Sequence, residues 1–163
     1  MKWILITLLV LAGIVLLVVV IGILLPQKHR VSRTILLRQA PDKVWSLITG
    51  PPNWRPDIQK SEELPPRNGH RVWRETDQSG QTITYEATES VPLRRWMTRI
   101  ADDKLPFGGT WTFEIAPVEQ GSSLTITEDG EVYNPIFRFV SRFMTGHTAS
   151  MDRYMQALET KLK

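Results

Sequence analysis

The stretch Gly109-Thr110-Trp111-Thr112-Phe113-Glu114-Ile115-Ala116 shows the clearest alternation of apolar and polar residues in this chain. Successive side chains of a β-strand point to opposite faces of the sheet. The stretch therefore predicts a half-buried strand that carries Trp111, Phe113 and Ile115 on its inner face.

The same two-residue period recurs on both sides of this strand. Short turns separate the runs, so we expect the strands to pair antiparallel. The expected strands are residues 31–38, 69–75, 81–89, 93–101 and 123–131. Trp96 shares a face with Thr98 and Ile100, and Glu128 continues the face formed by Leu124 and Ile126.

Helical spacing replaces the alternation in three places. Residues 40–49 predict a short helix with Pro41 in its first turn, and residues 53–58 predict a second small helix. After Asn134-Pro135, apolar residues recur at steps of three and four up to Leu162. This spacing predicts one long C-terminal helix with a broad apolar face.

An uncharged apolar run from Trp3 to Leu25 precedes all of these elements. At about 1.5 Å per residue, such a helix spans roughly 35 Å, slightly more than the ~30 Å hydrocarbon core of a bilayer. We therefore predict a transmembrane anchor over residues 1–26 that contacts the lipid bilayer through residues 3–25. A cleaved signal would have a shorter run and a small-residue cleavage site. A buried core helix would not be apolar on every face.

The charges beside the anchor indicate its orientation. Lys2 precedes the apolar run, whereas Lys28, Arg30 and Arg33 follow it. Lys and Arg near the ends of a span favour the cytoplasmic side. We therefore expect a single-pass protein of a bacterial-type inner (plasma) membrane with its C-terminal domain facing the cytoplasm.

The remaining charge is balanced. The net charge is +3, and residues 1–30 hold three basic residues and no acid, so the domain at residues 31–163 is neutral overall. No basic field remains there to attract nucleic acid, and we expect no nucleic-acid partner. The chain has no cysteine, which excludes disulfides, thiolate catalysis and cysteine zinc sites. The juxtamembrane linker at residues 27–30 is too short to carry the domain far from the bilayer.

Three stretches stand out in the order of these elements: Ala40-Pro41-Asp42-Lys43-Val44-Trp45, Gly109-Thr110-Trp111-Thr112-Phe113-Glu114 and Leu124-Thr125-Ile126-Thr127-Glu128-Asp129-Gly130. With the long helix after them, they resemble the helix-grip fold of the START-related (SRPBCC, polyketide cyclase/dehydrase-like) superfamily. The resemblance covers residues 31–162. It implies an α+β fold, with a curved antiparallel sheet wrapped around a long C-terminal helix. It also implies a cavity between them that holds a lipid, sterol, polyketide or other apolar molecule.

The superfamily also includes cyclases and chaperone activators, so the fold does not select a function. The chain has no phosphate-binding glycine loop, no catalytic-serine elbow and no histidine pair with metal spacing. We therefore expect no metal and no cofactor.

Glu128 and His147 are polar residues on otherwise apolar faces. If both point inward, they could form an acid/base pair across the cavity or bind the head group of a ligand. The alternative is that Glu128 lies at a strand end in water and His147 is a hydrogen-bonded core residue.

The expected ligand-binding residues lie on the inner face of the sheet and on the apolar face of the long helix: Trp96, Trp111, Phe113, Glu128, Met144, His147 and Met151. The aromatic residues could equally fill a core. The methionines favour a cavity wall, because flexible thioethers suit irregular apolar surfaces.

These features favour a membrane-tethered, non-catalytic domain that binds a hydrophobic small molecule or lipid in an internal cavity. One alternative is an enzyme of the polyketide cyclase/dehydratase type that uses Glu128 and His147 as acid and base. Another is a ligand-free domain that binds other proteins.

Overall fold

The structure is a computed structural model that describes residues 2–146 and 148–163. These residues form one antiparallel sheet with the strand order β1-β7-β6-β5-β4-β3-β2. The strands are β1 (Lys28–Leu37), β2 (Ile58–Arg67), β3 (His70–Asp77), β4 (Thr82–Val91), β5 (Arg95–Ile100), β6 (Phe107–Val118) and β7 (Gly121–Val132). The helices are α1 (Lys2–Leu24), α2 (Pro41–Thr49), α3 (Pro135–Val140), the π-helix η1 (Ser141–Thr145) and α4 (Ala149–Leu162).

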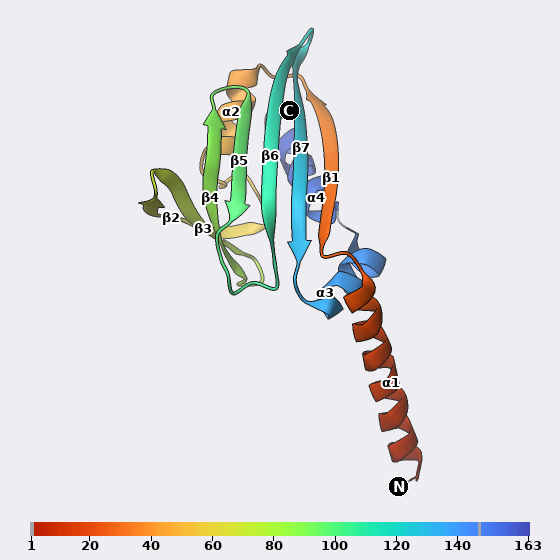
Figure 1. The fold of residues 1–163 in the computed structure, drawn as a ribbon. Helices are drawn as coiled ribbons and strands as arrows, with labels where there is room; N and C mark the ends of the chain where they lie inside the picture. The colour runs from red at the N-terminus through yellow and green to blue at the C-terminus, as the bar shows by residue number, and fades with distance from the viewer. Residues whose placement is uncertain (1, 147) are drawn as a thin grey trace.

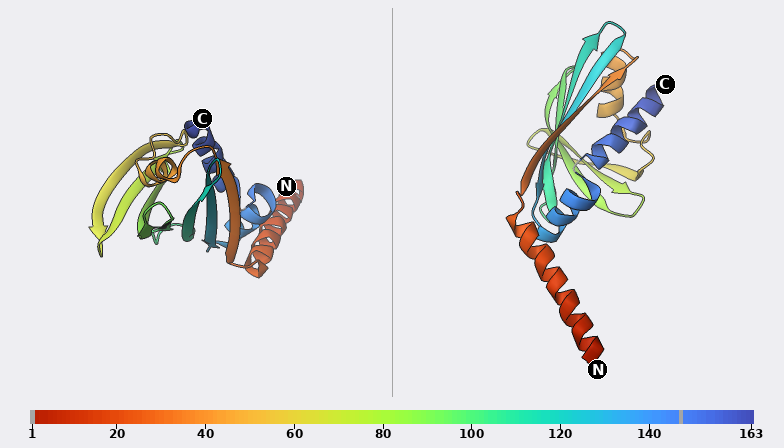
Figure 2. Two further views of the ribbon diagram at one scale, coloured as in Figure 1. Left: turned by 90° about the horizontal axis from the view of Figure 1, so that it is seen from above. Right: turned by 90° about the vertical axis from the view of Figure 1, so that its right-hand side faces the viewer.

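The sheet curves around α4, and α2 covers another part of the same face (Figures 1 and 2). The first strand forms one edge by pairing with the last, so that Val31 lies opposite Glu128. This arrangement confirms the expected α+β helix-grip fold. The core between the sheet and these helices contains the following residues, each at most 4% exposed: Val44, Ile48, Leu124, Ile126, Met151 and Leu158.

The alternation in β6 places its residues as expected. Phe113 and Ile115 are 3% and 5% exposed, whereas Glu114 between them is exposed. Full burial of one such apolar side chain contributes about 1.5–3 kcal/mol. The strand is therefore held in register by its inner face, since a shift of one residue would turn that face outward.

The prediction of a second small helix at residues 53–58 is wrong. Asn53 and Trp54 lie in a turn, and β2 begins at Ile58. The Trp54 indole N–H donates a 3.1 Å hydrogen bond to the Leu47 carbonyl, which holds this turn against the end of α2. β2 was not predicted because it is an edge strand with mostly exposed residues and contains Pro65-Pro66, which an edge tolerates.

The prediction of one long C-terminal helix is also wrong. α3 passes into η1, and Gly146 then adopts φ 72° and ψ 162°, outside any helical conformation. Positive φ angles are readily adopted by glycine, which has no Cβ. The helix that the sheet encloses is therefore α4, and the residues before Gly146 form a separate segment beside α1 (Figure 1).

The expected linker at residues 27–30 is shorter than predicted, because Lys28 already begins β1. Lys28 forms a 3.1 Å ion pair with Glu131 across the strand pair. The Gln27 carbonyl accepts a 2.9 Å hydrogen bond from the Val132 backbone N–H. The end of α1 is thus joined to the sheet with almost no free chain between them. α1 itself is long and apolar enough to cross a membrane, and its most apolar window has no buried residue.

Candidate functional site

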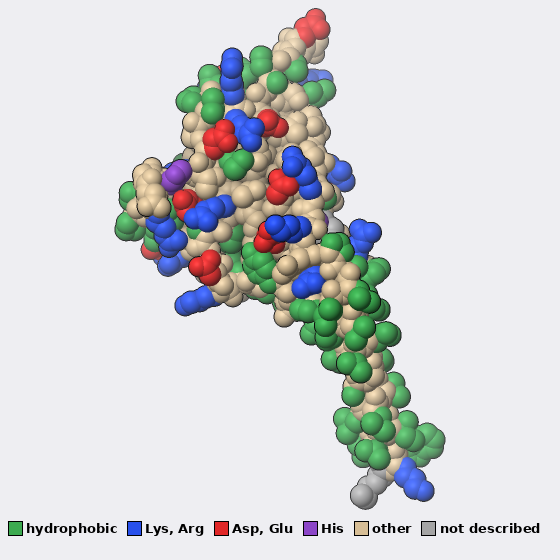
Figure 3. Space-filling view, viewed as in Figure 1, with side chains coloured by type: hydrophobic (Ala, Val, Ile, Leu, Met, Phe, Trp, Pro, Cys, Tyr) green, Lys and Arg blue, Asp and Glu red, His purple; other side chains and the backbone are tan. Residues whose placement is uncertain are grey.

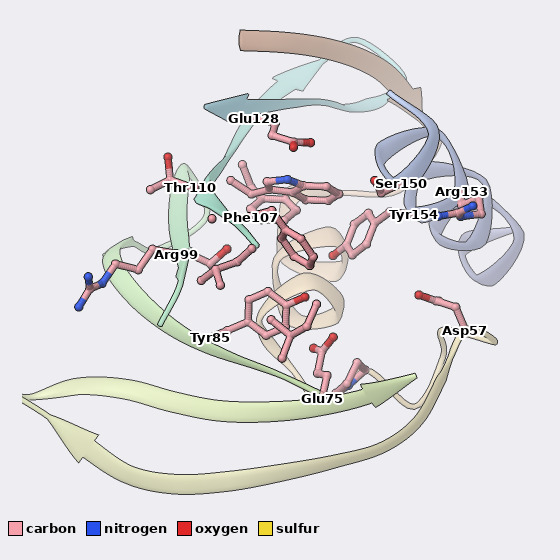
Figure 4. A pocket seen from close by; sticks show the side chains of 18 of the residues that line it. Asp57, Glu75, Tyr85, Arg99, Phe107, Thr110, Glu128, Ser150, Arg153 and Tyr154 are labelled. Atoms are coloured by element: carbon pink, nitrogen blue, oxygen red, sulfur yellow. The ribbon is translucent and has the colours of Figure 1, made fainter. Parts of the chain in front are cut away.

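A cavity of about 450 Å³ lies between the inner face of the sheet and α4 (Figure 4). This volume falls in the ~300–1,000 Å³ range of small-molecule sites. Its walls are mostly aromatic and come from β3, β4, β5, β6 and α4. The aromatic lining residues on these elements are Trp73, Tyr85, Trp96, Phe107, Trp111, Phe113 and Tyr154.

Strand register brings these rings together. Trp73 pairs with Tyr85 across β3 and β4, and their ring centroids are 5.6 Å apart. Trp96 pairs with Phe113 across β5 and β6, with centroids 5.2 Å apart. Directly opposed side chains of an antiparallel pair share one face of the sheet. The aromatic wall is therefore built by residues at inner positions of four neighbouring strands.

Tyr154 closes the wall from the helix side. Its ring meets Trp111 edge-to-face with centroids 5.7 Å apart. Figure 4 shows the hydroxyl groups of Tyr85 and Tyr154 directed into the cavity. Burial raises the pKa of both phenols, so both hydroxyls remain protonated and can donate hydrogen bonds to a ligand.

Glu128 projects into one end of the cavity (Figure 4). Its Oε1 lies 3.3 Å from His29 Nε2, and both side chains are less than one-fifth exposed. Its Oε2 is buried and has no hydrogen-bond partner within the described part of the chain. A buried carboxylate oxygen without a partner is energetically unfavourable unless a ligand or water supplies a donor.

Burial raises the pKa of the Glu128 carboxyl above its usual range. The neighbouring His29 acts in the opposite direction and lowers it. The Trp111 indole lowers it further without reaching hydrogen-bond geometry to Oε2. Burial is the largest of these effects, so on balance the Glu128 carboxyl group holds its proton more tightly than an exposed carboxyl group does.

Gly130 makes room for this pair. It lies directly opposite His29 in the β1–β7 register. A Cβ at Gly130 would collide with the imidazole of His29 and approach Oε1 of Glu128. A glycine at this strand position therefore allows the imidazole to lie across β7 and reach the carboxyl group.

A second polar group lies at the other end of the cavity. Glu75 is 7% exposed and accepts hydrogen bonds from Arg55 at 2.8 Å and from the Trp73 indole at 2.9 Å. Arg55 also pairs with Asp57 at 2.6 Å, and its guanidinium lies 5.3 Å from the ring centroid of Tyr154. The cavity thus has an aromatic middle between two ends that carry ionisable side chains.

The predicted site residues that the structure describes lie in three different environments: the cavity wall, the core and the exposed surface. The four on the sheet line the cavity: Trp96, Trp111, Phe113 and Glu128. Met151 is fully buried in the core and is not a lining residue, and Met144 is 74% exposed. Met144 is exposed because the break at Gly146 separates its segment from α4. His147 lies outside the described residues.

Sequence reasoning missed His29, Arg55, Glu75 and Tyr154 as lining residues. The signal for His29 was present, because the alternation of Val31 and Ile35 continues backward to position 29. The described residues contain no cluster of three or more histidine or acidic side chains that could hold a metal ion.

A curved sheet that encloses an apolar cavity against a C-terminal helix defines a ligand-binding domain of the helix-grip type. The chain belongs to the family described as "Polyketide cyclase / dehydrase and lipid transport", which matches residues 28–163. No significant match occurs among curated proteins.

Solved structures share this fold at low sequence identity. A START superfamily protein from Mycobacterium smegmatis is 19% identical with a TM-score of 0.64, covering 82% of this chain and 97% of that chain. A protein from Mesorhizobium loti is 17% identical with a TM-score of 0.62, covering 81% and 95%. Norcoclaurine synthase from Thalictrum flavum is 11% identical with a TM-score of 0.62, covering 82% and 86%.

Proposed function

We propose that this chain is a membrane-tethered, non-catalytic domain that binds a hydrophobic small molecule or lipid in its cavity. The observation that carries the proposal is the buried Oε2 of Glu128, which faces an aromatic cavity and accepts no hydrogen bond from the described residues. Such a site favours a ligand with an apolar body and one hydrogen-bond donor, such as a hydroxyl group.

The position of Glu128 supports the membrane connection. Glu128 lies four residues before the end of β7, where Val132 is bonded to Gln27 directly after α1. The Glu128 end of the cavity is therefore the end closer to α1. The family description, which includes lipid transport, agrees with a ligand of this kind.

Photocrosslinking of the full chain in liposomes tests this proposal. The probes are a long-chain fatty alcohol that carries a diazirine and its methyl ether, which has the same body but no donor. We expect the alcohol to label peptides that contain Trp111 and Tyr154, and the ether to label them much less. Glu128→Ala should reduce the difference between the probes.

A cavity-filling variant supplies the matched control. Ile83 lines the cavity from β4, whereas Val91 lies on the same strand, is 42% exposed and is not a lining residue. Ile83→Trp should abolish labelling of the cavity peptides, and Val91→Trp should leave it unchanged. Labelling confined to α1 in all variants would contradict the proposal.

The contact between His29 and Glu128 favours one second candidate, an enzyme that uses this pair as acid and base. A carboxyl group beside an imidazole in an apolar cavity can transfer protons to or from a bound substrate. Mass spectrometry of molecules extracted from the full chain and from Glu128→Gln separates the two functions. A binding protein retains the same molecule in both, whereas an enzyme retains its substrate only in the variant.

A further inference from the structure

Large apolar side chains on α3 and η1 are exposed beside α1. Ile136, Phe137, Phe143 and Met144 are 44%, 50%, 61% and 74% exposed. These four residues are called the α3–η1 surface below. Hydrophobic side chains cover α1 and continue onto its junction with the domain (Figure 3). Contiguous exposed apolar surface of this kind marks an interaction site.

The α3–η1 surface is fixed to the last turn of α1. Arg138 donates hydrogen bonds from Nη1 to the Gly22 carbonyl at 3.1 Å and to the Leu25 carbonyl at 3.2 Å. The last carbonyl groups of a helix have no partner within it, so Arg138 caps α1. Gly22 is buried against the backbone of Pro135, where a Cβ would collide. The surface therefore cannot move away from the end of α1 without loss of these contacts.

The same segment borders the cavity. Phe137 and Ser141 are lining residues, together with Gly146 and Ser150 just beyond η1. α3 contacts α1 and follows Val132, which is bonded to Gln27, so Phe137 and Ser141 line the cavity from the part of the domain that adjoins α1. A partner that binds the α3–η1 surface would thus lie next to the part of the cavity that Phe137 and Ser141 line.

The length of α1 sets the depth of this surface. An anchor of roughly 35 Å exceeds the ~30 Å hydrocarbon core by about three residues. The turn that contacts α3 consequently lies at the boundary between acyl chains and head groups. Short amphipathic segments bury their apolar face at this boundary.

We propose that the α3–η1 surface inserts into the bilayer beside the C-terminal end of α1 and opens the cavity toward the membrane. The α3–η1 surface then contacts lipid acyl chains, close to the head groups, in the leaflet that contains the C-terminal end of α1. The ligand is accordingly a bilayer-resident amphiphile that enters the cavity without crossing water. This inference rests on the membrane anchor of the proposed function and adds a second, separate membrane contact.

Single cysteines test this inference, because the natural chain contains none. Met144→Cys carries a spin label on the α3–η1 surface, and Leu36→Cys is the matched control. Both positions are 74% exposed, but Leu36 lies near the distant end of β1. Leu16→Cys, at 65% exposure in the middle of α1, reports the anchor itself.

The full-length protein is measured in liposomes of phosphatidylcholine and phosphatidylglycerol. Collisions of the label with molecular oxygen report the membrane phase, and collisions with nickel ethylenediaminediacetate report water. We expect oxygen to dominate several-fold at positions 16 and 144, and the nickel complex to dominate several-fold at position 36.

The outcomes distinguish this inference from the proposed anchor. A label at position 16 in lipid and one at position 144 in water would overturn only the insertion of α3 and η1. A water-exposed label at position 16 would overturn the anchor as well. Protection of position 144 from both reagents would mean that a protein covers the surface, which also overturns the inference.

Discussion

His29 Nε2 lies 3.3 Å from Glu128 Oε1 inside the cavity. The two residues come from β1 and β7, the first and last strands in the sequence, which are neighbours in the sheet. The sheet edge that follows α1 thereby supplies the imidazole, and the strand that precedes α3 supplies the carboxyl group. The pair joins the two segments that connect the domain to α1. The contact therefore lies where the cavity meets the part of the domain that adjoins α1.

The stability of the protein should depend on pH through Glu128. Its pKa is raised in the folded state, chiefly by burial, so the folded protein holds this proton more tightly than the unfolded chain. The free energy of unfolding should therefore fall as pH rises from about 4, near the ordinary carboxyl pKa, toward neutrality. Glu128→Gln should lack this decline.

Chemical denaturation of the full chain in detergent micelles, from about pH 4 to about pH 8, measures this effect. The charge-matched control is Glu119→Gln, an exposed carboxyl in the β6–β7 turn outside the cavity. The prediction would be contradicted if the free energy of unfolding of wild type, relative to that of Glu128→Gln, stayed constant or rose with increasing pH.

Gly130→Ala should raise the pKa of Glu128 further. The added methyl group collides with His29 and displaces its imidazole, which is one of the groups that lower this pKa. The variant retains the side chains of both His29 and Glu128, so it tests the effect of their contact and not the effect of removing either group. Carboxyl-carbon NMR of labelled Glu128 during a pH titration measures the shift.

His70 provides an internal reference in the same titration. Its Nδ1 lies 2.8 Å from the Ala87 carbonyl, in a different part of the sheet. Its ring signals should be the same in wild type and Gly130→Ala. An unchanged Glu128 titration together with a moved His29 signal would show that the imidazole does not influence the carboxyl group.

Alternation along single strands was sufficient to predict the cavity face of the sheet. Trp96, Trp111, Phe113 and Glu128 all lie on it, because a half-buried strand shows its inner face as a two-residue period. His29 was missed for a physical reason, since Lys28 and Arg30 on either side carry charges typical of a juxtamembrane linker. Those charges are in fact paired across β1 and β7 with Glu131 and Asp129.

Contacts between distant segments could not be predicted in the same way. Arg55 lies in an irregular turn, and its interactions with Glu75 and Tyr154 depend on the curvature of the sheet. The division of the C-terminal helix was missed because Met144 and Met151 keep helical spacing across the break. Among the described residues between them, Gly146 has backbone angles outside any helical conformation.

Arg55→Ala should destabilise the fold strongly. It removes the guanidinium from Glu75, whose side chain is 8% exposed and retains only the Trp73 indole among the hydrogen bonds described for it. Loss of one partner of a buried ion pair costs about 3–5 kcal/mol, because the remaining charge stays uncompensated. Chemical denaturation measures the loss.

The double variant Arg55→Ala/Glu75→Gln should recover part of that stability, since it removes the unpaired charge. Lys60→Ala breaks the exposed Lys60–Glu62 pair and should change the free energy of unfolding very little. A double variant less stable than Arg55→Ala would show that Glu75 stabilises the cavity by a route other than its charge.

Gly22→Leu should separate α3 from α1, whereas Gly13→Leu should not. Gly22 packs directly on Pro135, while a Cβ at Gly13 has no neighbour within 4 Å. Both substitutions remove a helical glycine from the same helix and raise helix propensity equally. Only the first forces the Arg138 hydrogen bonds to the end of α1 to break. Hydrogen exchange of residues 133–146, measured on full-length protein in liposomes, should accelerate in Gly22→Leu and match wild type in Gly13→Leu. Equal exchange in both variants would mean that α3 is held in place by contacts other than those with α1.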